Sequence, residues 1–271
     1  MSKPPLQRHP PKAPVTPASP APDGERLSKR VMQLKACSRR EAEQYIEGGW
    51  VRVNGQVVEV PMARVAEHTV QVDPQASLMA LTDVTLLLHK PPGFDAMAAP
   101  GQANQRVKPA QQLLQVANHA ADDESGLRVL QHHFAKLSAC VPLETGASGL
   151  VVFTQDWRVL RKLTEDAAFL ERELLVEVQG TVTPEMLHRL NTPPASDRQT
   201  VPEVKVSINS TGDNSTRLRF AFKGAHPGLI AWLCERVGLH ISSMKRLRVG
   251  RVGLAHLPVG QWRYLLPHER F

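Results

Sequence analysis

Residues 38–57 carry the strongest local folding signal in the chain. Ser38 is a suitable helix N-cap, and Glu41 three residues later completes a capping box, so a short helix is predicted to begin there. A Gly-Gly pair ends that helix. The alternating strand Val51–Val53 then leads into Asn54-Gly55, the favoured two-residue hairpin turn. The segment is therefore predicted to be a short helix followed by a β-hairpin.

A second short helix is predicted just before this segment. Leu27, Val31 and Leu34 recur at helical spacing and share one face, as do Ala42, Tyr45 and Ile46 on the following helix.

Basic charge gathers at the two ends of the chain. Residues 1–40 hold nine Lys and Arg against two acidic residues, and residues 239–271 hold six against one, whereas the remainder is net acidic. Clusters of Lys and Arg favour a polyanionic partner, because binding releases phosphate counterions. Nucleic acid is therefore the first candidate partner and an anionic membrane surface the second. A basic face that is solvated and binds no partner is the remaining alternative.

Several classes of protein are disfavoured by composition. Residues 1–25 hold eight prolines and few large apolar residues, which predicts a disordered basic tail rather than a cleaved presequence. Three widely spaced cysteines do not make a disulfide framework, and no apolar run approaches the roughly 20 residues of a membrane span. A cytoplasmic protein without membrane contact is expected.

The helix pair and hairpin over residues 26–77 resemble the alpha-L RNA-binding motif, the small module named after ribosomal protein S-four. The resemblance rests on the Ser-Arg-Arg-Glu-Ala helix start and the Val-Arg-Val-Asn-Gly hairpin in that order. A helix pair of this charge binding an acidic protein is the alternative. The candidate RNA contacts in this module are Arg26, Lys29, Arg30, Lys35, Ser38, Arg39, Arg40 and Arg52.

Residues 80–271 mix strands and helices without a regular βαβ rhythm or a Gly-rich phosphate loop, which predicts an α+β domain. Strands are expected at 86–90, 150–154, 174–178, 203–208 and 217–222, and helices at 110–117, 127–137, 157–168 and 228–237. Because aromatic residues are scarce, Trp232, Trp262, Phe153 and Phe169 are expected in the core.

This larger segment resembles the RNA pseudouridine synthases of the RsuA/RluF type. The closing block Met244–Gly250, Leu257–Gly260 and Trp262–Leu265 is the strongest match, and Lys90-Pro91-Pro92-Gly93 adds to it. That family also carries an alpha-L module at its N-terminus. The resemblance implies a mixed, mostly antiparallel sheet and isomerisation of a uridine that is flipped out of structured RNA, without a metal or an organic cofactor. Lys90, Lys245, Arg246 and Arg248 are further candidate RNA contacts, the last three on one exposed strand face.

The catalytic region departs from the family pattern. Glu144 stands where the resemblance places a catalytic aspartate, and Pro142 replaces the arginine two residues before it. Leu174 stands in place of a base-stacking tyrosine, and residues 227–232 carry no basic residue where the family has the arginine that pairs with the carboxylate. Glu144 is nevertheless the candidate catalytic residue.

Two functions remain open from the sequence. The first is an enzyme that isomerises a specific uridine to pseudouridine, and the second is an inactive or weak relative that binds RNA or assists ribosome assembly. Ribosomal RNA is the expected partner, a tRNA anticodon stem is the second, and a monomer is expected. Adjacent His132 and His133 point about 100° apart on a helix, so no metal site is predicted.

Overall fold

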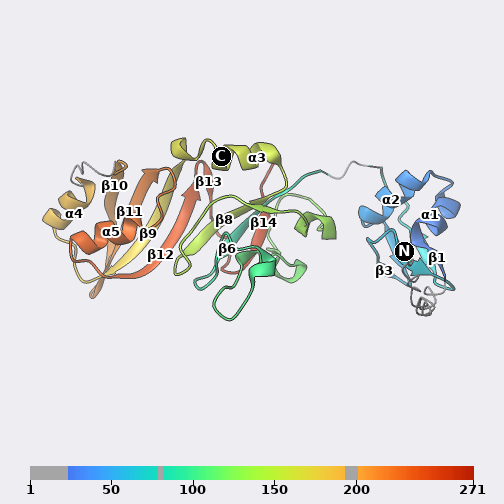
Figure 1. Cartoon of the computed structure of the whole chain (residues 1–271), viewed down its shortest axis with the longest axis horizontal. Helices are drawn as coiled ribbons and strands as arrows, with labels where there is room; N and C mark the ends of the chain where they lie inside the picture. The colour runs from blue at the N-terminus through green and yellow to red at the C-terminus, as the bar shows by residue number, and fades with distance from the viewer. Residues whose placement is uncertain (1–23, 79–81, 193–200) are drawn as a thin grey trace, which may run out of the picture. The chain divides into compact units, whose positions relative to one another are not determined.

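The computed structural model describes residues 24–78, 82–192 and 201–271. The chain divides into two compact units, Met1–Ala80 and Leu81–Phe271, and each is described by itself (Figure 1). Of the tail predicted at 1–25, residues 1–23 lie outside the described part, and Glu25 belongs to a strand.

The first unit is a helix pair packed on small antiparallel sheets. Its elements are β1 (Glu25–Arg26), α1 (Leu27–Lys35), α2 (Arg39–Glu47), β2 (Val51–Val53), β3 (Gln56–Val57), β4 (Arg64–Val65) and β5 (Val70–Val72). β3, β2 and β5 form one sheet, and β1 pairs with β4. The predicted capping box is present, because Ser38 Oγ accepts from the Glu41 N–H and Glu41 accepts from the Ser38 N–H.

The core of the first unit follows the predicted helix faces with one exception. Leu27, Val31, Ala42 and Ile46 are completely buried. Leu34, expected on the same face, is 54% exposed, so that prediction was wrong. The reason is that α1 ends one residue later, at Lys35, and Ala36 adopts a left-handed conformation that turns the chain away.

The second unit is built on a mixed, mostly antiparallel sheet, as the resemblance implies. Its order is β10-β11-β9-β12-β8-β6-β14, and only the β12–β8 contact is parallel among the described pairs. The strands are β6 (Thr85–Lys90), β7 (Ser138–Ala139), β8 (Ser148–Thr154), β9 (Glu171–Gln179), β10 (Val204–Thr211), β11 (Ser215–Lys223), β12 (Ile241–Val249), β13 (Val252–Gly253) and β14 (Trp262–Tyr264).

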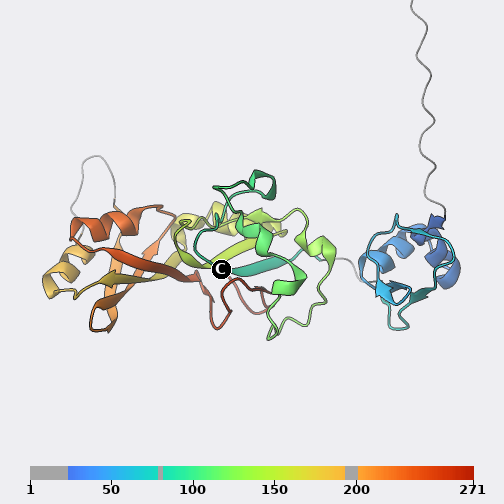
Figure 2. The same cartoon turned by 90° about the horizontal axis from the view of Figure 1, so that it is seen from below.

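Helices cover both faces of this sheet. α4 (Pro184–Asn191) and α5 (Leu229–Arg236) lie near β10 and β11 and join one apolar cluster (Figures 1 and 2). α3 (Trp157–Thr164) belongs to a second cluster with Leu150 and Val152. Neighbouring residues of β8 point to opposite faces, so Val151 and Phe153 join the first cluster and Leu150 and Val152 the second. Every residue of β6 is buried, because apolar clusters cover both faces of the sheet at this strand.

Two predicted helices are replaced by short 3-10 turns. The segment 110–117 forms Ala110–Leu113 and the start of Val116–Asn118, and 127–137 forms only Gln131–Phe134. Distant side chains bind carbonyls at these turns: Trp262 Nε1 donates to the Gln115 carbonyl, and Gln155 Nε2 donates to those of His132 and Ala135. Of these three carbonyls, only that of His132 would accept a hydrogen bond inside a predicted helix, so a tertiary hydrogen bond competes with the helical pattern at 127–137.

The aromatic predictions were right at two positions and wrong at two. Trp262 and Phe153 are completely buried, whereas Trp232 is 39% and Phe169 is 75% exposed. The core around α5 is filled by Leu229, Ile230, Leu233 and Cys234 instead, which leaves Trp232 on the outer side of the helix.

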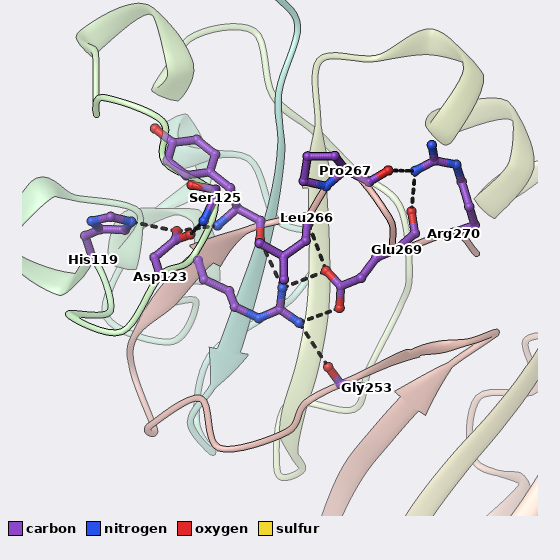
Figure 3. A network of polar contacts seen from close by, with 10 residues as sticks. His119, Asp123, Ser125, Gly253, Leu266, Pro267, Glu269 and Arg270 are labelled. Carbon is purple, nitrogen blue, oxygen red and sulfur yellow. Dashed lines mark hydrogen bonds and ion pairs between the residues drawn. The ribbon is translucent and has the colours of Figure 1, made fainter.

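A polar network fixes the C-terminal segment against the sheet (Figure 3). Arg263 donates two hydrogen bonds to the Glu269 carboxylate, at 2.7 and 2.8 Å. Asp123 accepts from the Tyr264 N–H at 2.8 Å and lies 2.7 Å from His119 Nε2. These bonds tie β14 and the chain end to the loop at 119–125, so the closing sequence block is a structural element of the second unit.

Candidate functional site

A cavity of about 310 Å³ opens in the second unit where the loop before β8 meets β9, β11, β12 and the start of α5. It brings together the three segments in which the sequence departs from the family pattern. The lining residues are Asp95, Met97, Pro142, Leu143, Glu144, Thr145, Arg172, Leu174, Phe222, His226, Pro227, Ile230 and Arg246. Trp232, from the same segment as Ile230, does not line this cavity.

Glu144 is half-buried in the cavity wall and is held by backbone. Its Oε1 accepts a hydrogen bond from the Gly228 N–H at 3.2 Å. Gly228 is the N-cap of α5 and has a positive φ of 80°, which a glycine adopts without strain. Among the described residues, no Lys or Arg nitrogen lies within ion-pair distance of the carboxylate.

Arg246 holds the backbone of the loop that carries Glu144. Its side chain is fully buried and donates to the carbonyls of Leu150 at 2.7 Å, Pro142 at 2.6 Å and Val141 at 3.2 Å. Burial lowers the pKa of this guanidinium to about 9; the charge of Arg172 acts in the same direction, and Glu144 opposes both. Arg246 thus sets the position of the Glu144 backbone without pairing with its carboxylate.

Lys90 holds the other end of the same loop. Its ammonium donates to the carbonyls of Ala147 at 2.6 Å, Pro91 at 3.1 Å and Thr145 at 3.3 Å, and the residue is fully buried. Burial lowers the pKa of Lys90 to about 8, helped by Arg246 and opposed by Asp95 and Glu144. Lys90 was a candidate RNA contact, but its ammonium already donates to three backbone carbonyls, two of them in the loop.

Arg172 is the least satisfied charge in the site. The residue is 4% exposed, and its Nε has no hydrogen-bond partner among the described residues. Burial lowers the pKa of Arg172, and the negative charge of Glu144 opposes that shift. An unpaired buried cation is costly, so Glu144 is the group that offsets this cost.

Arg172 was not among the candidates from the sequence, although a signal for it exists. Along β9 the buried positions alternate and include Arg172, Leu174, Val176 and Val178. An arginine on the inward face of an otherwise apolar strand indicates a buried charge that needs a partner. That alternation was readable before the structure was known.

The remaining cavity wall is apolar where the resemblance implies polar contacts. Leu174 occupies the position expected to hold the stacking tyrosine, Ile230 belongs to the segment 227–232 expected to hold the carboxylate-pairing arginine, and both line the cavity. Phe222 of β11 adds an aromatic ring. The wall can pack against a base, but among the lining residues only Arg172 and Arg246 remain as arginines.

The prediction that Lys245, Arg246 and Arg248 share an exposed face of β12 is wrong, because Arg246 is buried and the other two are half-buried. The register of β12 against β9 shifts twice, between Ile241 and Ser243 and between Arg246 and Arg248, which breaks simple alternation. Arg248 is bound by the carboxylates of Glu171 and Glu173. Lys245 is half-buried.

The first unit presents most of its predicted contacts to solvent. The exposed residues are Arg26, Lys29, Lys35, Ser38, Arg39, Arg40 and Arg52, whereas Arg30 is half-buried. Arg30 bonds Glu25 and the Ala66 carbonyl, Arg39 pairs with Glu43 at 2.8 Å, and the Ser38 hydroxyl is used in the helix cap. A hollow of about 370 Å³ is lined by Arg26, Lys29, Arg39 and Arg64 among others.

Metal-binding groups and membrane-spanning helices are both absent from the part of the chain that the structure describes. The described parts of the chain contain no group of three or more His, Cys, Asp or Glu arranged to hold a metal ion. They also contain no helix with the length and apolar character needed to cross a bilayer.

Comparison with known proteins places these observations in a family context. The S4 domain family matches residues 25–70. An uncharacterized RNA pseudouridine synthase of Aquifex aeolicus is 28% identical over 250 residues, which is 90% of this chain and 94% of the relative. The dual-specificity RNA pseudouridine synthase RluF of Escherichia coli is 24% identical over 90% of this chain and 76% of its own length.

Two more relatives cover the same extent. The ribosomal large subunit pseudouridine synthase B of Bacillus subtilis is 25% identical over 90% of this chain and 93% of its own length. A crystal structure of a pseudouridylate synthase superimposes with a TM-score of 0.53 at 17% identity, covering 89% of this chain and 95% of that one. The chain has an S4 domain at its N-terminus and a pseudouridine-synthase fold after it, and it is homologous to RNA pseudouridine synthases of the RluF/RsuA type.

Proposed function

We propose that this protein binds structured ribosomal RNA and isomerises one uridine to pseudouridine, with Glu144 as the reacting carboxylate. The observation that carries the proposal is the position of Glu144: it lines the cavity, is held by the Gly228 N–H, and lies close enough to the buried Arg172 to offset its charge. The relatives named for RNA pseudouridine synthesis support the substrate class.

The chemistry requires a uridine to leave its helix and enter the cavity, because the glycosidic bond is inaccessible in a stacked duplex. The N1–C1′ bond breaks, the base turns, and a C5–C1′ bond forms; C5 loses its proton and N1 gains one, so the product is an isomer of the substrate. Glu144 serves as the nucleophile or base. Leu174, Phe222 and Ile230 exclude water and pack against the ring. The reaction needs no added cofactor.

The two units divide the work in this proposal. Residues 26–77 anchor the RNA through the exposed basic side chains of α1 and α2, and residues 80–271 carry the cavity. We place the protein as a monomer in the cytoplasm, where ribosomal RNA is available. A tRNA anticodon stem is the second RNA to test.

A second candidate function is RNA binding without turnover. It is favoured by Leu174, because an aliphatic side chain cannot replace an aromatic stacking surface, and by the segment 227–232, which holds no arginine to pair with the carboxylate. An aspartate-to-glutamate change also moves a carboxylate by about 1.5 Å, and an offset of about 1 Å can cost on the order of a hundredfold in rate. In this case the protein would act in ribosome assembly.

One experiment separates the two candidates. Total RNA is compared between a strain lacking the gene and the same strain carrying the wild type or Glu144→Gln, with pseudouridine mapped by carbodiimide-dependent reverse-transcriptase stops. A site that is lost on deletion and restored only by the wild type establishes the isomerase and names its substrate. Unchanged pseudouridine at every site, with RNA still crosslinking to the protein, rejects isomerisation and supports the binding function.

A further inference from the structure

A second cavity lies directly beside the first and has no place in the proposed reaction. It measures about 560 Å³, within the range of about 300–1,000 Å³ typical of ligand pockets. His226 and Pro227 line both cavities, and Gly228, which binds Glu144, lines the second. The two cavities are therefore separated by only the short segment that enters α5.

The second cavity is apolar over about half of its surface and contains an exposed tryptophan. Pro202, Pro227, Leu229 and Trp232 contribute apolar surface, His226 contributes an imidazole, and none of the described lining residues is acidic. Trp232 is 39% exposed, so part of its indole is open to a ligand. Its indole is rigid because it has only two side-chain torsions.

Arg236 is stacked against this tryptophan. It follows Trp232 by one helical turn on α5, and its guanidinium carbon lies 4.9 Å from the ring centroid. The end of α5 is anchored in turn, because Arg189 of α4 donates to the Arg236 carbonyl at 2.9 Å. The result is an aromatic surface with an adjoining positive charge, both on a fixed helix.

We propose that Trp232 and Arg236 form a stacking site for the nucleotide that neighbours the flipped uridine in the RNA. The inference rests on the proposed function, because it takes the first cavity to hold that uridine. A nucleotide next to the extruded one has lost its stacking partner, and an aromatic side chain can replace that partner. Arg236 contributes its charge beside the ring and toward the phosphate backbone.

RNA fits this surface better than a protein partner does. The second cavity shares His226 and Pro227 with the cavity that holds the reacting carboxylate, none of its described lining residues is acidic, and the positive charge of Arg236 beside Trp232 suits a polyanion. The stacking contact is insensitive to base identity, since every base has a π-face. It would therefore strengthen RNA binding without selecting the target sequence.

The test uses the full chain and a single-stranded uridine 12-mer, with the matching 12-base-pair duplex as a second probe. Trp157 supplies a matched control, because it is 61% exposed and also lies beside an arginine, Arg158, but lines neither cavity. Trp232→Ala should weaken binding of the single strand by roughly 5- to 150-fold, the equivalent of losing one base stack. Trp232→Phe should retain most of the affinity, and Trp157→Ala should leave it unchanged.

A local signal checks that the loss is not caused by misfolding. In a Trp50→Phe, Trp157→Phe background, adding the 12-mer should quench the emission of Trp232, and the quenching should disappear on Trp232→Phe. Equal affinity of Trp232→Ala and the wild type, or an equal loss from Trp157→Ala, overturns the inference while the pseudouridine assay still decides the proposed function. Unchanged RNA affinity together with a loss of self-association in Trp232→Ala assigns the surface to a second copy of the chain instead. Absence of any RNA binding by the wild type rejects both proposals.

Discussion

Glu144 and Arg172 should stabilise each other, and a double-mutant cycle measures this directly. In the wild type, the buried guanidinium of Arg172 is offset by the nearby carboxylate. Glu144→Gln removes that charge and leaves the cations of Lys90, Arg172 and Arg246 buried around the cavity without it. We expect Glu144→Gln to destabilise the second unit. We expect the added change Arg172→Gln to restore stability, because it removes the unpaired cation.

The size of the coupling follows from the burial of the two groups. Exposed ion pairs contribute about 0–1 kcal/mol, whereas breaking a fully buried pair costs about 3–5 kcal/mol. Glu144 is half-buried and Arg172 is buried, and they form no direct ion pair, so we expect a coupling of about 1–2 kcal/mol. For a unit of this size that corresponds to roughly 2–8 °C in Tm.

The assay is thermal unfolding at pH 7 of the wild type, both single variants and the double variant. Arg161 and Glu165 on α3 provide the control cycle, because both side chains are more than 60% exposed and 3.1 Å apart. The control coupling should stay below about 0.5 kcal/mol. Arg172→Gln could lower Tm by the same amount in the wild type and in the Glu144→Gln variant. In that case Glu144 does not offset the charge of Arg172, and the proposed stabilising interaction between the two residues is refuted.

Three further predictions concern the scaffold and the RNA-binding unit. Gly149 has a φ of 116°, and a Cβ there would lie 2.4 Å from the backbone nitrogen of Arg246. Gly149→Ala should therefore lower the free energy of unfolding, measured in urea, by about 3 kcal/mol or more. A Cβ at Gly146 meets open space, so Gly146→Ala should cost little. Burial lowers the pKa of His133 to about 4. Between pH 6.5 and 4 the unfolded chain therefore binds a proton at this residue that the folded chain excludes, so the free energy of unfolding should fall by up to about 3 kcal/mol over that range. The fall should be smaller in His133→Gln. Arg40 is exposed, so Arg40→Ala should lower the slope of log affinity against log salt by about 1, and an unchanged slope would remove it from the RNA interface.

Local signals in the sequence predicted the first unit well. The capping box at Ser38 and the Asn54-Gly55 hairpin depend on contacts within a few residues, and both are present. In the second unit the strands were predicted because their apolar runs reflect burial. The helices predicted at 110–117 and 127–137 are short 3-10 turns instead, and at 127–137 the His132 carbonyl is bound by Gln155, which is remote in sequence.

The candidate site shows the same division. The motif positions predicted that Glu144, Leu174 and the segment at 227–232 would meet, and Glu144 and Leu174 do line one cavity with Pro227 and Ile230 of that segment. The roles of the basic residues could not be predicted, because each depends on burial. Lys90 and Arg246 look like RNA contacts in the sequence, yet their donors bind the loop at 141–147.

The departures from the family pattern fall at Pro142, Glu144, Leu174 and residues 227–232, whereas the residues that hold the loop by its backbone are retained. Lys90, Gly149 and Arg246 together hold the segment bearing Glu144, through carbonyl contacts and a close backbone approach that only glycine permits. Random loss of function would not spare this scaffold, because its buried charges are destabilising once the loop is released. A carboxylate that still offsets buried cations is retained for stability even where turnover is lost. The presence of Glu144 is therefore compatible with both candidate functions, and its coupling to Arg172 and its effect on pseudouridine must be measured separately.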